Sequence, residues 1–298
     1  MNLRPRPRRE GDGLIDGAEY VLTREDFRTI ARIMREEAGI ALPESKATLV
    51  YSRLAKRLRT LGLGSFAEYC ELVESQQGGA ERQEMLGALT TNVTRFFREP
   101  HHFEHLRSRI LPPLMAHARS GGRVRLWSAA CSSGQEPYSI ALTVLALLPE
   151  APRFDIRILA TDIERTMLAT GRAGLYEASE IAAVPPELRE RWFEPANNNS
   201  PKFRIAEAAR SLVAFRPLNL IGTWPMRGRF NAIFCRNVVI YFDDETQKQV
   251  WARMVPLLEE GGALYIGHSE RVSGPAERAL GNDGITTYRL AGAREMRG

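Results

Sequence analysis

Apolar residues recur every three to four positions between residues 23 and 90, which is the spacing of amphipathic helices. Thr23, which is followed closely by two acids, is typical of a helix start, and Gly39 is typical of a helix end. The same signals predict helices over residues 23–39, 44–61, 66–74 and 80–90. We therefore expect an all-helical N-terminal domain over residues 19–90.

From residue 123 the pattern changes to short buried strands that alternate with helices. The strand-like runs are VRLWSAA, DIRILATD, LVAF, FNAIFCRN, ALYIGHSE and, near the end of the chain, TTYRL. Such alternation predicts a doubly wound α/β domain with a parallel sheet, which we place over residues 91–298. The 39 residues between Arg172 and Leu212 are more than an ordinary connection needs, and they predict a subdomain inserted over residues 174–211.

Composition narrows the class of protein. Hydrophobic residues make up 44% of the chain and charged residues 26%, which is typical of a folded globular protein. The longest apolar stretch, Ile140 to Leu148, has nine residues, about half of what a membrane helix needs, and no signal-peptide pattern opens the sequence. The three cysteines are far apart, which indicates reduced thiols rather than disulfides or a zinc knuckle. We expect a cytoplasmic protein.

The charge balance points to the class of partner. The chain has 41 Lys and Arg residues against 36 Asp and Glu residues, a formal net charge of +5. This excess favours an acidic partner, which could be nucleic acid, an anionic membrane or an acidic protein. Part of the excess lies in residues 1–18, where four arginines and no apolar period predict a mobile basic tail. Another part lies between Ser45 and Thr60, a stretch without any acid.

Candidate cofactor residues follow the first two predicted strands. The turn CSSGQEP lies after the first strand, where open α/β sheets bind nucleotides, but it is not a GxGxxG motif. Glu136 opens the next helix and would repel a pyrophosphate, although a plain helix-capping carboxylate is the alternative. Asp162 ends the second strand, where an acid typically binds ribose hydroxyls. Together these residues favour S-adenosylmethionine over NAD.

Further polar residues occur at later strand ends and at the domain junction. Asn219–Leu220 and Arg236–Asn237 are predicted at the same sheet edge, as ligand contacts or as satisfied structural polar groups. The segment 91–99 joins the two domains, a favoured place for ligands, with a helix end carrying exposed arginines as the alternative. His101 and His105 have metal-ligand spacing but no predictable third ligand, so we assign no metal.

Six segments carry a family resemblance: TTNVTRFFRE, LWSAACSSGQEPYSIA, ATDIERTMLATGRAGLY, FRPLNL, FNAIFCRNVVIYF and GGALYIGHSE. In this order they resemble the CheR family of bacterial chemotaxis receptor methyltransferases, and the similarity covers nearly the whole chain from about residue 20. The resemblance implies a Rossmann-like S-adenosylmethionine-dependent methyltransferase domain with a small inserted β-subdomain, behind an all-helical domain. It also implies a protein-glutamate O-methyltransferase, which methylates glutamate side chains on the cytoplasmic helices of chemoreceptors (methyl-accepting chemotaxis proteins). The products would be a glutamate methyl ester and S-adenosylhomocysteine.

The resemblance also assigns site residues. Carried over by motif, the cofactor-binding residues would be Asn92, Thr94, Arg98, Glu136, Asp162, Asn219, Leu220, Arg236 and Asn237. Cys131 and Gln135 depart from the family pattern, and we expect neither to abolish cofactor binding. A substrate glutamate is already an anion at neutral pH, so no strong general base is needed. We assign to Arg98 and Tyr241 the catalytic task of orienting this carboxylate.

Partner expectations follow from the same resemblance. A receptor helix bundle rich in Glu would be attracted by the basic helix, whose alternative is a solvated face. The substrate-binding candidates are Lys46, Arg53, Arg57 and Arg59. The loop PANNNSPK lacks glycine, unlike the loop of members that dock on a receptor's C-terminal pentapeptide tether, so we expect tether independence. We expect no membrane insertion.

Two other functions are compatible with parts of this pattern. A nucleic-acid or small-molecule methyltransferase would share the fold, but the (D/N)PP(Y/F) element of base methylation is absent and RNVVIY stands in its place. We therefore expect no nucleic-acid partner. A noncatalytic S-adenosylmethionine sensor or adaptor would have kept the fold and lost turnover. Against it stand the intact Arg98, Glu136, Asp162 and Tyr241.

Overall fold

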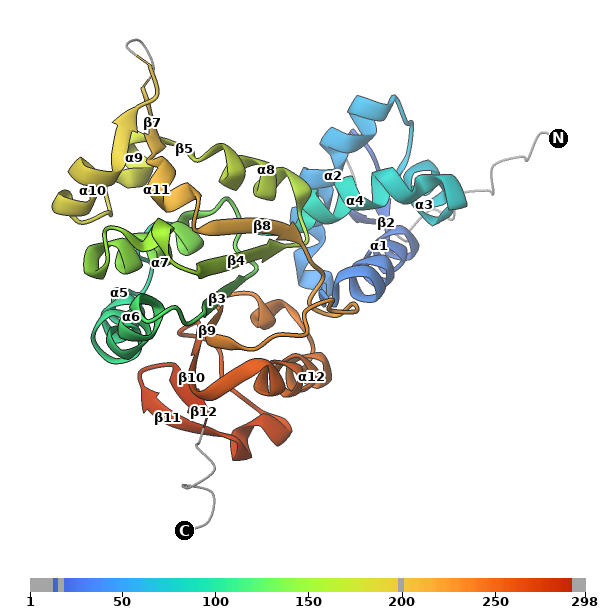
Figure 1. Ribbon diagram of the computed structural model, residues 1–298. Helices are drawn as coiled ribbons and strands as arrows, with labels where there is room; N and C mark the ends of the chain where they lie inside the picture. The colour runs from blue at the N-terminus through green and yellow to red at the C-terminus, as the bar shows by residue number, and fades with distance from the viewer. Residues whose placement is uncertain (1–12, 16–18, 198–200, 291–298) are drawn as a thin grey trace. The chain divides into compact units, whose positions relative to one another are not determined.

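The computed structural model describes residues 13–15, 19–197 and 201–290 (Figure 1). Its internal contacts divide the chain into two compact units, Met1–Thr91 and Asn92–Gly298. The basic tail predicted over residues 1–18 lies outside the described residues except for residues 13–15, and so does the middle of the loop PANNNSPK. No helix in the described ranges is long and apolar enough to cross a membrane.

The first unit is built on helices that match the predicted periodicity. Its α-helices, within the described residues, are α1 (Arg24–Ala38), α2 (Ala47–Leu61), α3 (Phe66–Glu74) and α4 (Gly79–Leu89), with 3₁₀ turns η1 (Glu44–Lys46) and η2 (Gln76–Gly78). The Thr23 hydroxyl accepts the Asp26 N–H while the Asp26 carboxylate accepts the Thr23 N–H, a capping box that begins α1. Gly39 ends the helix at φ 73°, in the left-handed region that glycine adopts without strain.

Two short strands that the sequence did not predict precede the helices of the first unit. Strands β1 (Gly13–Ile15) and β2 (Leu22–Thr23) form an antiparallel pair just before α1. Strands of two or three residues are too short to show a clear alternation of polar and apolar positions, so the pattern could not reveal them.

The second unit contains a seven-stranded sheet in the order β11-β12-β10-β9-β3-β4-β8. Its strands are β3 (Val124–Ala129), β4 (Ile156–Asp162), β8 (Val213–Pro217), β9 (Phe230–Cys235), β10 (Leu258–Ile266), β11 (Leu280–Gly284) and β12 (Thr287–Leu290). Strands β10, β9, β3, β4 and β8 run parallel, and β12 and β11 add an antiparallel edge. The chain order reverses at β3, which lies between β4 and β9, and ligands of doubly wound folds bind at such a reversal.

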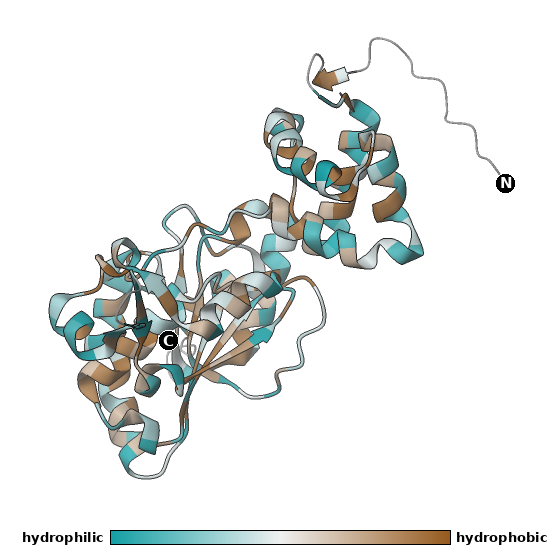
Figure 2. Ribbon diagram, turned by 90° about the horizontal axis from the view of Figure 1, so that it is seen from above, coloured by the Kyte–Doolittle hydropathy of each residue, from teal (hydrophilic) through white to brown (hydrophobic). Residues whose placement is uncertain are grey.

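Helices cover both faces of this sheet, with α6 and α7 on one side and α12 on the other (Figure 1). The helices and turns around the sheet are α5 (Pro100–His105), the π-helical η3 (Leu106–Ile110), α6 (Leu111–Arg119), α7 (Gln135–Leu147), η4 (Ala151–Arg153), α8 (Arg165–Ala173), η5 (Val239–Tyr241), α12 (Asp244–Met254), η6 (Val255–Leu257) and η7 (Gly274–Arg278). Helix α7 is buried along most of its length, which explains the apolar run from Ile140 to Leu148. Apolar residues also line the central strands (Figure 2).

The predicted insertion is present as a small β-subdomain. Strands β5 (Leu175–Glu177), β6 (Phe193–Pro195) and β7 (Lys202–Ile205) form an antiparallel sheet in the order β5-β7-β6. Short helices α9 (Ala178–Ile181), α10 (Pro186–Trp192) and α11 (Glu207–Arg210) accompany it. The described fold is thus the predicted one: a doubly wound α/β unit with a small β-insertion, preceded by a mainly helical unit.

Candidate active site

The carboxyl ends of the central strands lie side by side in register. Ala129 at the end of β3 pairs with Thr161 on β4 and with Cys235 on β9. On β8, Pro217 pairs with Asp162. The segments that follow these strands carry all the predicted cofactor residues of the α/β sheet, so the parallel register brings these residues to one edge.

The turn after β3 has an unusual backbone. Ala130 and Ser132 have φ values of 60° and 49°, in the left-handed region that non-glycine residues rarely adopt, and Gly134 has φ 98°. A Cβ at Gly134 would lie 2.8 Å from the Tyr176 hydroxyl, so packing as well as φ requires glycine there. Two hydrogen bonds stabilise the turn: the Cys131 N–H donates to the Thr161 carbonyl at 2.8 Å, and the Ser132 N–H donates to Asp162 Oδ2 at 2.8 Å.

Asp162 is 7% exposed and uses both carboxylate oxygens. Oδ2 accepts the Ser132 N–H, and Oδ1 accepts the Glu164 N–H at 2.9 Å. Burial raises the pKa of Asp162, against the opposing effect of these two donors. Each oxygen of a carboxylate can accept more than one hydrogen bond, so Asp162 has acceptor capacity left for hydroxyl groups such as those of a ribose.

Glu136 and Arg236, both predicted to contact the cofactor, bind each other in the structure. Glu136 Oε1 accepts the Ser128 hydroxyl at 2.7 Å, and its Oε2 lies 3.0 Å from Arg236 Nη1. The Arg236 side chain is 1% exposed, and its Nη2 donates to the carbonyl of Arg98. Burial raises the pKa of Glu136, and the charge of Arg236 opposes that effect. Arg236, which directly follows β9, therefore holds the backbone of residue 98 next to the end of that strand.

The segment 92–99 is an irregular loop on the second unit and not the end of a helix, although Arg95 is exposed as that alternative expected. Phe96 is buried, with its ring in edge contact with Tyr176. The Phe97 N–H donates to the Ser139 hydroxyl at 2.9 Å, and Arg98 Nη1 donates to the Val93 carbonyl at 2.9 Å. The Asn92 side chain bonds to the Glu164 carboxylate, whereas Thr94 is partly exposed.

The segment after β8 folds into a turn that uses Asn219 itself. The Asn219 Oδ1 accepts the Ile221 N–H at 3.1 Å, and the carbonyls of Asn219 and Leu220 both accept the Trp224 indole N–H. Leu220 is buried. Because the Leu218 N–H donates to the Asp162 carbonyl at 3.0 Å, this turn lies at the same edge as Asp162.

Two family descriptions match this chain. Residues 92–288 match "CheR methyltransferase, SAM binding domain", and residues 25–90 match "CheR methyltransferase, all-alpha domain". The chain belongs to the CheR methyltransferase family. This confirms the resemblance seen in the sequence, and it makes S-adenosylmethionine the cofactor of this enzyme.

Curated relatives carry the same description. The chain is 58% identical over 254 residues to the "Probable chemotaxis protein methyltransferase" of Rhizobium etli. The aligned region covers 85% of this chain and 95% of the relative. The chain is 42% identical over 269 residues to the "Chemotaxis protein methyltransferase" of Escherichia coli, covering 89% and 90% respectively. This CheR methyltransferase is thus an S-adenosylmethionine-dependent enzyme of chemotaxis.

Glu270 was not singled out in the sequence, although its carboxylate organises the loop after β9. It accepts the N–H groups of Asn237, Val238 and Val239 at 2.9, 2.8 and 3.0 Å, as well as that of Gly267. Asn237 has φ 58°, so these bonds maintain a left-handed residue at the strand end. Tyr241 lies in η5 directly after this loop. The available signal was an acid in the otherwise apolar motif ALYIGHSE.

Several basic side chains of helix α2 in the CheR all-alpha domain are bonded to other groups of the first unit, which the sequence did not indicate. Arg57 binds the Glu81 carboxylate through Nε and Nη2 at 3.0 and 2.6 Å. Arg53 Nη1 donates to the carbonyls of Ala88 and Thr90, so a solvated face is wrong for these two arginines. Arg59 lies 3.1 Å from Glu19, and Lys46 is exposed.

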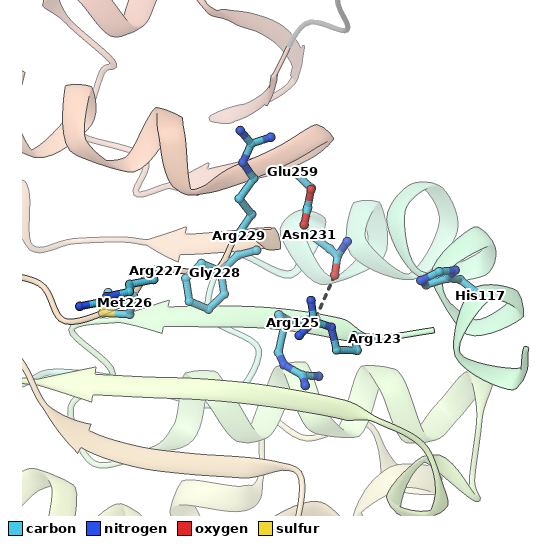
Figure 3. Close-up of a pocket in the computed structure, with 10 residues that line it drawn as sticks. His117, Arg123, Arg125, Met226, Arg227, Gly228, Arg229, Asn231 and Glu259 are labelled. Atoms are coloured by element: carbon cyan, nitrogen blue, oxygen red, sulfur yellow. Dashed lines mark hydrogen bonds between the residues drawn. The ribbon is translucent and has the colours of Figure 1, made fainter. Parts of the chain in front are cut away.

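A cavity of about 410 Å³ lies at the opposite, amino-terminal ends of β3 and β9 in this CheR enzyme (Figure 3). It is lined by arginines that include Arg125, Arg227 and Arg229. Figure 3 shows Arg227 and Arg229 extending in different directions, and Arg125 binds Asp155 at 2.7 Å. The guanidinium groups do not converge on one point, so the candidate active site remains at the carboxyl edge.

Proposed function

We propose that this enzyme transfers a methyl group from S-adenosylmethionine to glutamate side chains in the cytoplasmic helical region of chemoreceptors. It would then be a protein-glutamate O-methyltransferase acting in chemotactic adaptation in the cytoplasm, with S-adenosylhomocysteine as the second product. The observation that carries the proposal is the placement of Arg98: Arg236, which is buried and paired with Glu136, donates to the Arg98 carbonyl at the carboxyl edge of the sheet, where we place the cofactor.

The residues at this edge fit S-adenosylmethionine. Asp162 retains acceptor capacity for ribose hydroxyls, and the small residues Ala130 and Ser132 allow close approach to the backbone. The other residues proposed to line the cofactor site are Asn92, Thr94, Arg98, Glu136, Asn219, Leu220, Arg236 and Asn237. When bound, S-adenosylmethionine supplies a methyl group on a positively charged sulfur.

The protein's task is to orient the acceptor. A glutamate has an ordinary pKa of about 4.3, so it reaches the site as a carboxylate and needs no base. We assign to the Arg98 guanidinium the binding of this carboxylate through two parallel N–H donors, and to the Tyr241 hydroxyl a further hydrogen bond. Holding an anion at the right distance and angle while water is excluded can contribute several kcal/mol, of the order of 7–11 kcal/mol at most.

The receptor interaction is proposed to be electrostatic. Lys46 on η1 and Arg59 on α2 are exposed charges that can attract an acidic helix bundle. Arg53 and Arg57 on α2 add charge from positions bonded inside the first unit, and the contribution of Arg57 is smaller because Glu81 partly cancels it. The loop PANNNSPK contains no glycine, and we propose that the enzyme does not depend on a receptor tether.

The test is methyl transfer with a radiolabelled cofactor and a receptor cytoplasmic fragment. We expect label in the fragment that is released as volatile methanol by mild base, because methyl esters hydrolyse and N-methyl groups do not. A matched fragment with Ala at the acceptor glutamates is the control and should remain unlabelled. Base-stable label, or labelling of the control fragment to the same extent, would contradict glutamate methylation.

A further inference from the structure

Three side chains near the start of α5, Glu99, His101 and His102, can each offer a ligand atom to a metal ion, and these ligand atoms all lie within 4.8 Å of one another. Glu99 Oε2, His101 Nε2 and His102 Nδ1 are buried and have no hydrogen-bond partner among the described residues. Buried polar atoms in proteins are nearly always satisfied, and a bound cation is one way to satisfy these three.

The contacts of His102 allow one of its nitrogens to be a metal ligand. Nε2 lies 2.9 Å from the Thr286 hydroxyl and 3.3 Å from the Ile285 carbonyl, and both oxygens can accept a hydrogen bond. In the tautomer in which Nε2 carries the hydrogen, Nδ1 presents a lone pair. The lone pair of Nδ1 then points toward Glu99 Oε2 at 3.6 Å, which is also an acceptor.

The same geometry is typical of a metal-ligating histidine. Such a ring binds metal through one nitrogen and donates its other N–H to a carbonyl or carboxylate, and in this tautomer His102 Nε2 is placed to donate to the Ile285 carbonyl. In tetrahedral zinc sites with bonds of about 2.0–2.1 Å, neighbouring ligand atoms lie about 3.4 Å apart. The separation of 3.6 Å between His102 Nδ1 and Glu99 Oε2 is close to this value. The rings of His101 and His102 have centroids 4.2 Å apart, so both imidazoles lie at the cluster.

The charge around the cluster allows a cation despite a neighbouring arginine. Arg236 Nη2 lies 3.3 Å from Glu99 Oε2, but Arg236 is also paired with Glu136, so one guanidinium is shared by two carboxylates.

We propose that Glu99, His101 and His102 form a binding site for a divalent transition-metal ion of the zinc class. Two imidazole nitrogens and one carboxylate oxygen suit zinc or cobalt and do not suit magnesium or calcium, which prefer oxygen ligands. The sequence spacing had suggested His101 with His105 instead. In the structure His105 binds Tyr265 at 3.0 Å and Asp283 at 3.2 Å, outside this set. A water molecule would complete the coordination.

The test is direct metal binding by the full-length, tag-free protein after treatment with a chelator. Cobalt is titrated and followed by its visible absorption, and zinc affinity is measured by competition with a chromophoric chelator. We expect one equivalent of either ion to bind, no binding of magnesium at the same concentration, and a rise in Tm with zinc.

Variants distinguish this site from adventitious binding. His101→Gln removes one ligand, and we expect at least about tenfold weaker zinc binding with the rise in Tm lost. Glu99→Gln should act in the same direction. His117→Gln removes an exposed histidine outside the cluster and should leave zinc affinity unchanged. Circular dichroism checks that each variant is folded. Failure of the wild type to bind an equivalent of zinc or cobalt, or unchanged binding in His101→Gln, would overturn the proposal.

Discussion

At the scale of single residues, strained backbone gathers at the edge of the sheet. Six non-glycine residues in the described ranges have positive φ, and all but Thr286 lie in the three segments of the candidate active site. These five residues are Phe97, Glu99, Ala130, Ser132 and Asn237. Such conformations cost about 1–3 kcal/mol each and persist only where surrounding contacts enforce them. Here the enforcing groups are buried carboxylates and Arg236. They make this edge of the sheet rigid, so that even a small displacement of the bound substrate would affect the reaction.

Arg98→Ala should lower kcat for receptor methylation by about a hundredfold or more, because the acceptor carboxylate loses the group that orients it. The backbone of residue 98 should stay in place, since Arg236 binds its carbonyl and not its side chain. The measurement is kcat at saturating cofactor and receptor fragment. Arg95→Ala, which removes an exposed arginine of the same loop, is the matched control and should retain activity. A near-normal kcat for Arg98→Ala would remove Arg98 from the catalytic assignment.

At the scale of elements, the sequence predicted those helices and strands whose apolar residues recur at a regular spacing. The helix predicted over residues 66–74 has those bounds in the structure, because Ser65 caps it and Phe66, Tyr69 and Val73 lie on its buried face. The parallel strands were predicted because they are buried runs. The role of Glu270 was missed, since its partners are backbone N–H groups about 30 positions earlier, which leave no trace in the local pattern. The pairing of Glu136 with Arg236 was missed for the same reason.

Glu270→Gln should destabilise the loop after β9. An amide offers one oxygen, and its N–H₂ group would face backbone N–H donors, so we expect the free energy of unfolding to fall by about 1–3 kcal/mol. Because Asn237 and Tyr241 lie in or directly after this loop, kcat and cofactor affinity should fall as well. Urea unfolding and S-adenosylhomocysteine titration measure the two effects. Glu277→Gln, on an exposed acid nearby in sequence, should change neither, and an equally stable Glu270→Gln would contradict the proposed loop anchor.

In the helical unit, Arg57→Ala tests whether α2 and α4 depend on an ion pair. Glu81 is 8% exposed and also accepts the Tyr69 hydroxyl at 2.9 Å, so removing Arg57 leaves a nearly buried carboxylate with one partner fewer. We expect a loss of about 2 kcal/mol in the free energy of unfolding. Lys56→Ala removes an exposed charge from the same helix and should cost much less. Equal stabilities of the two variants, measured by urea unfolding, would show that the pair contributes nothing.

At the scale of the whole molecule, the net charge of +5 is distributed between structural and free groups. Many arginines pair with acids of the chain, as Arg57 does with Glu81 and Arg125 with Asp155. Paired charges keep a fixed place and are partly cancelled, so their effect on a distant partner is small. The exposed charges that remain on one surface decide how an acidic partner approaches. Lys46 therefore differs from Arg57, whose charge is paired with Glu81, although the sequence grouped the two together.

Lys46→Glu should therefore raise KM for the receptor fragment several-fold at low salt while leaving kcat unchanged. The exposed side chain has no catalytic contact, and its charge acts through the long-range field that brings an acidic helix bundle to the enzyme. The field is screened over about 8–10 Å at physiological ionic strength, so the dependence of KM on salt should be weaker in the variant than in the wild type. Arg119→Glu changes the net charge equally on the other unit and is the control. If both variants raise KM alike, the net charge of the molecule governs the encounter; if only Lys46→Glu does, the surface of α2 and η1 guides the receptor.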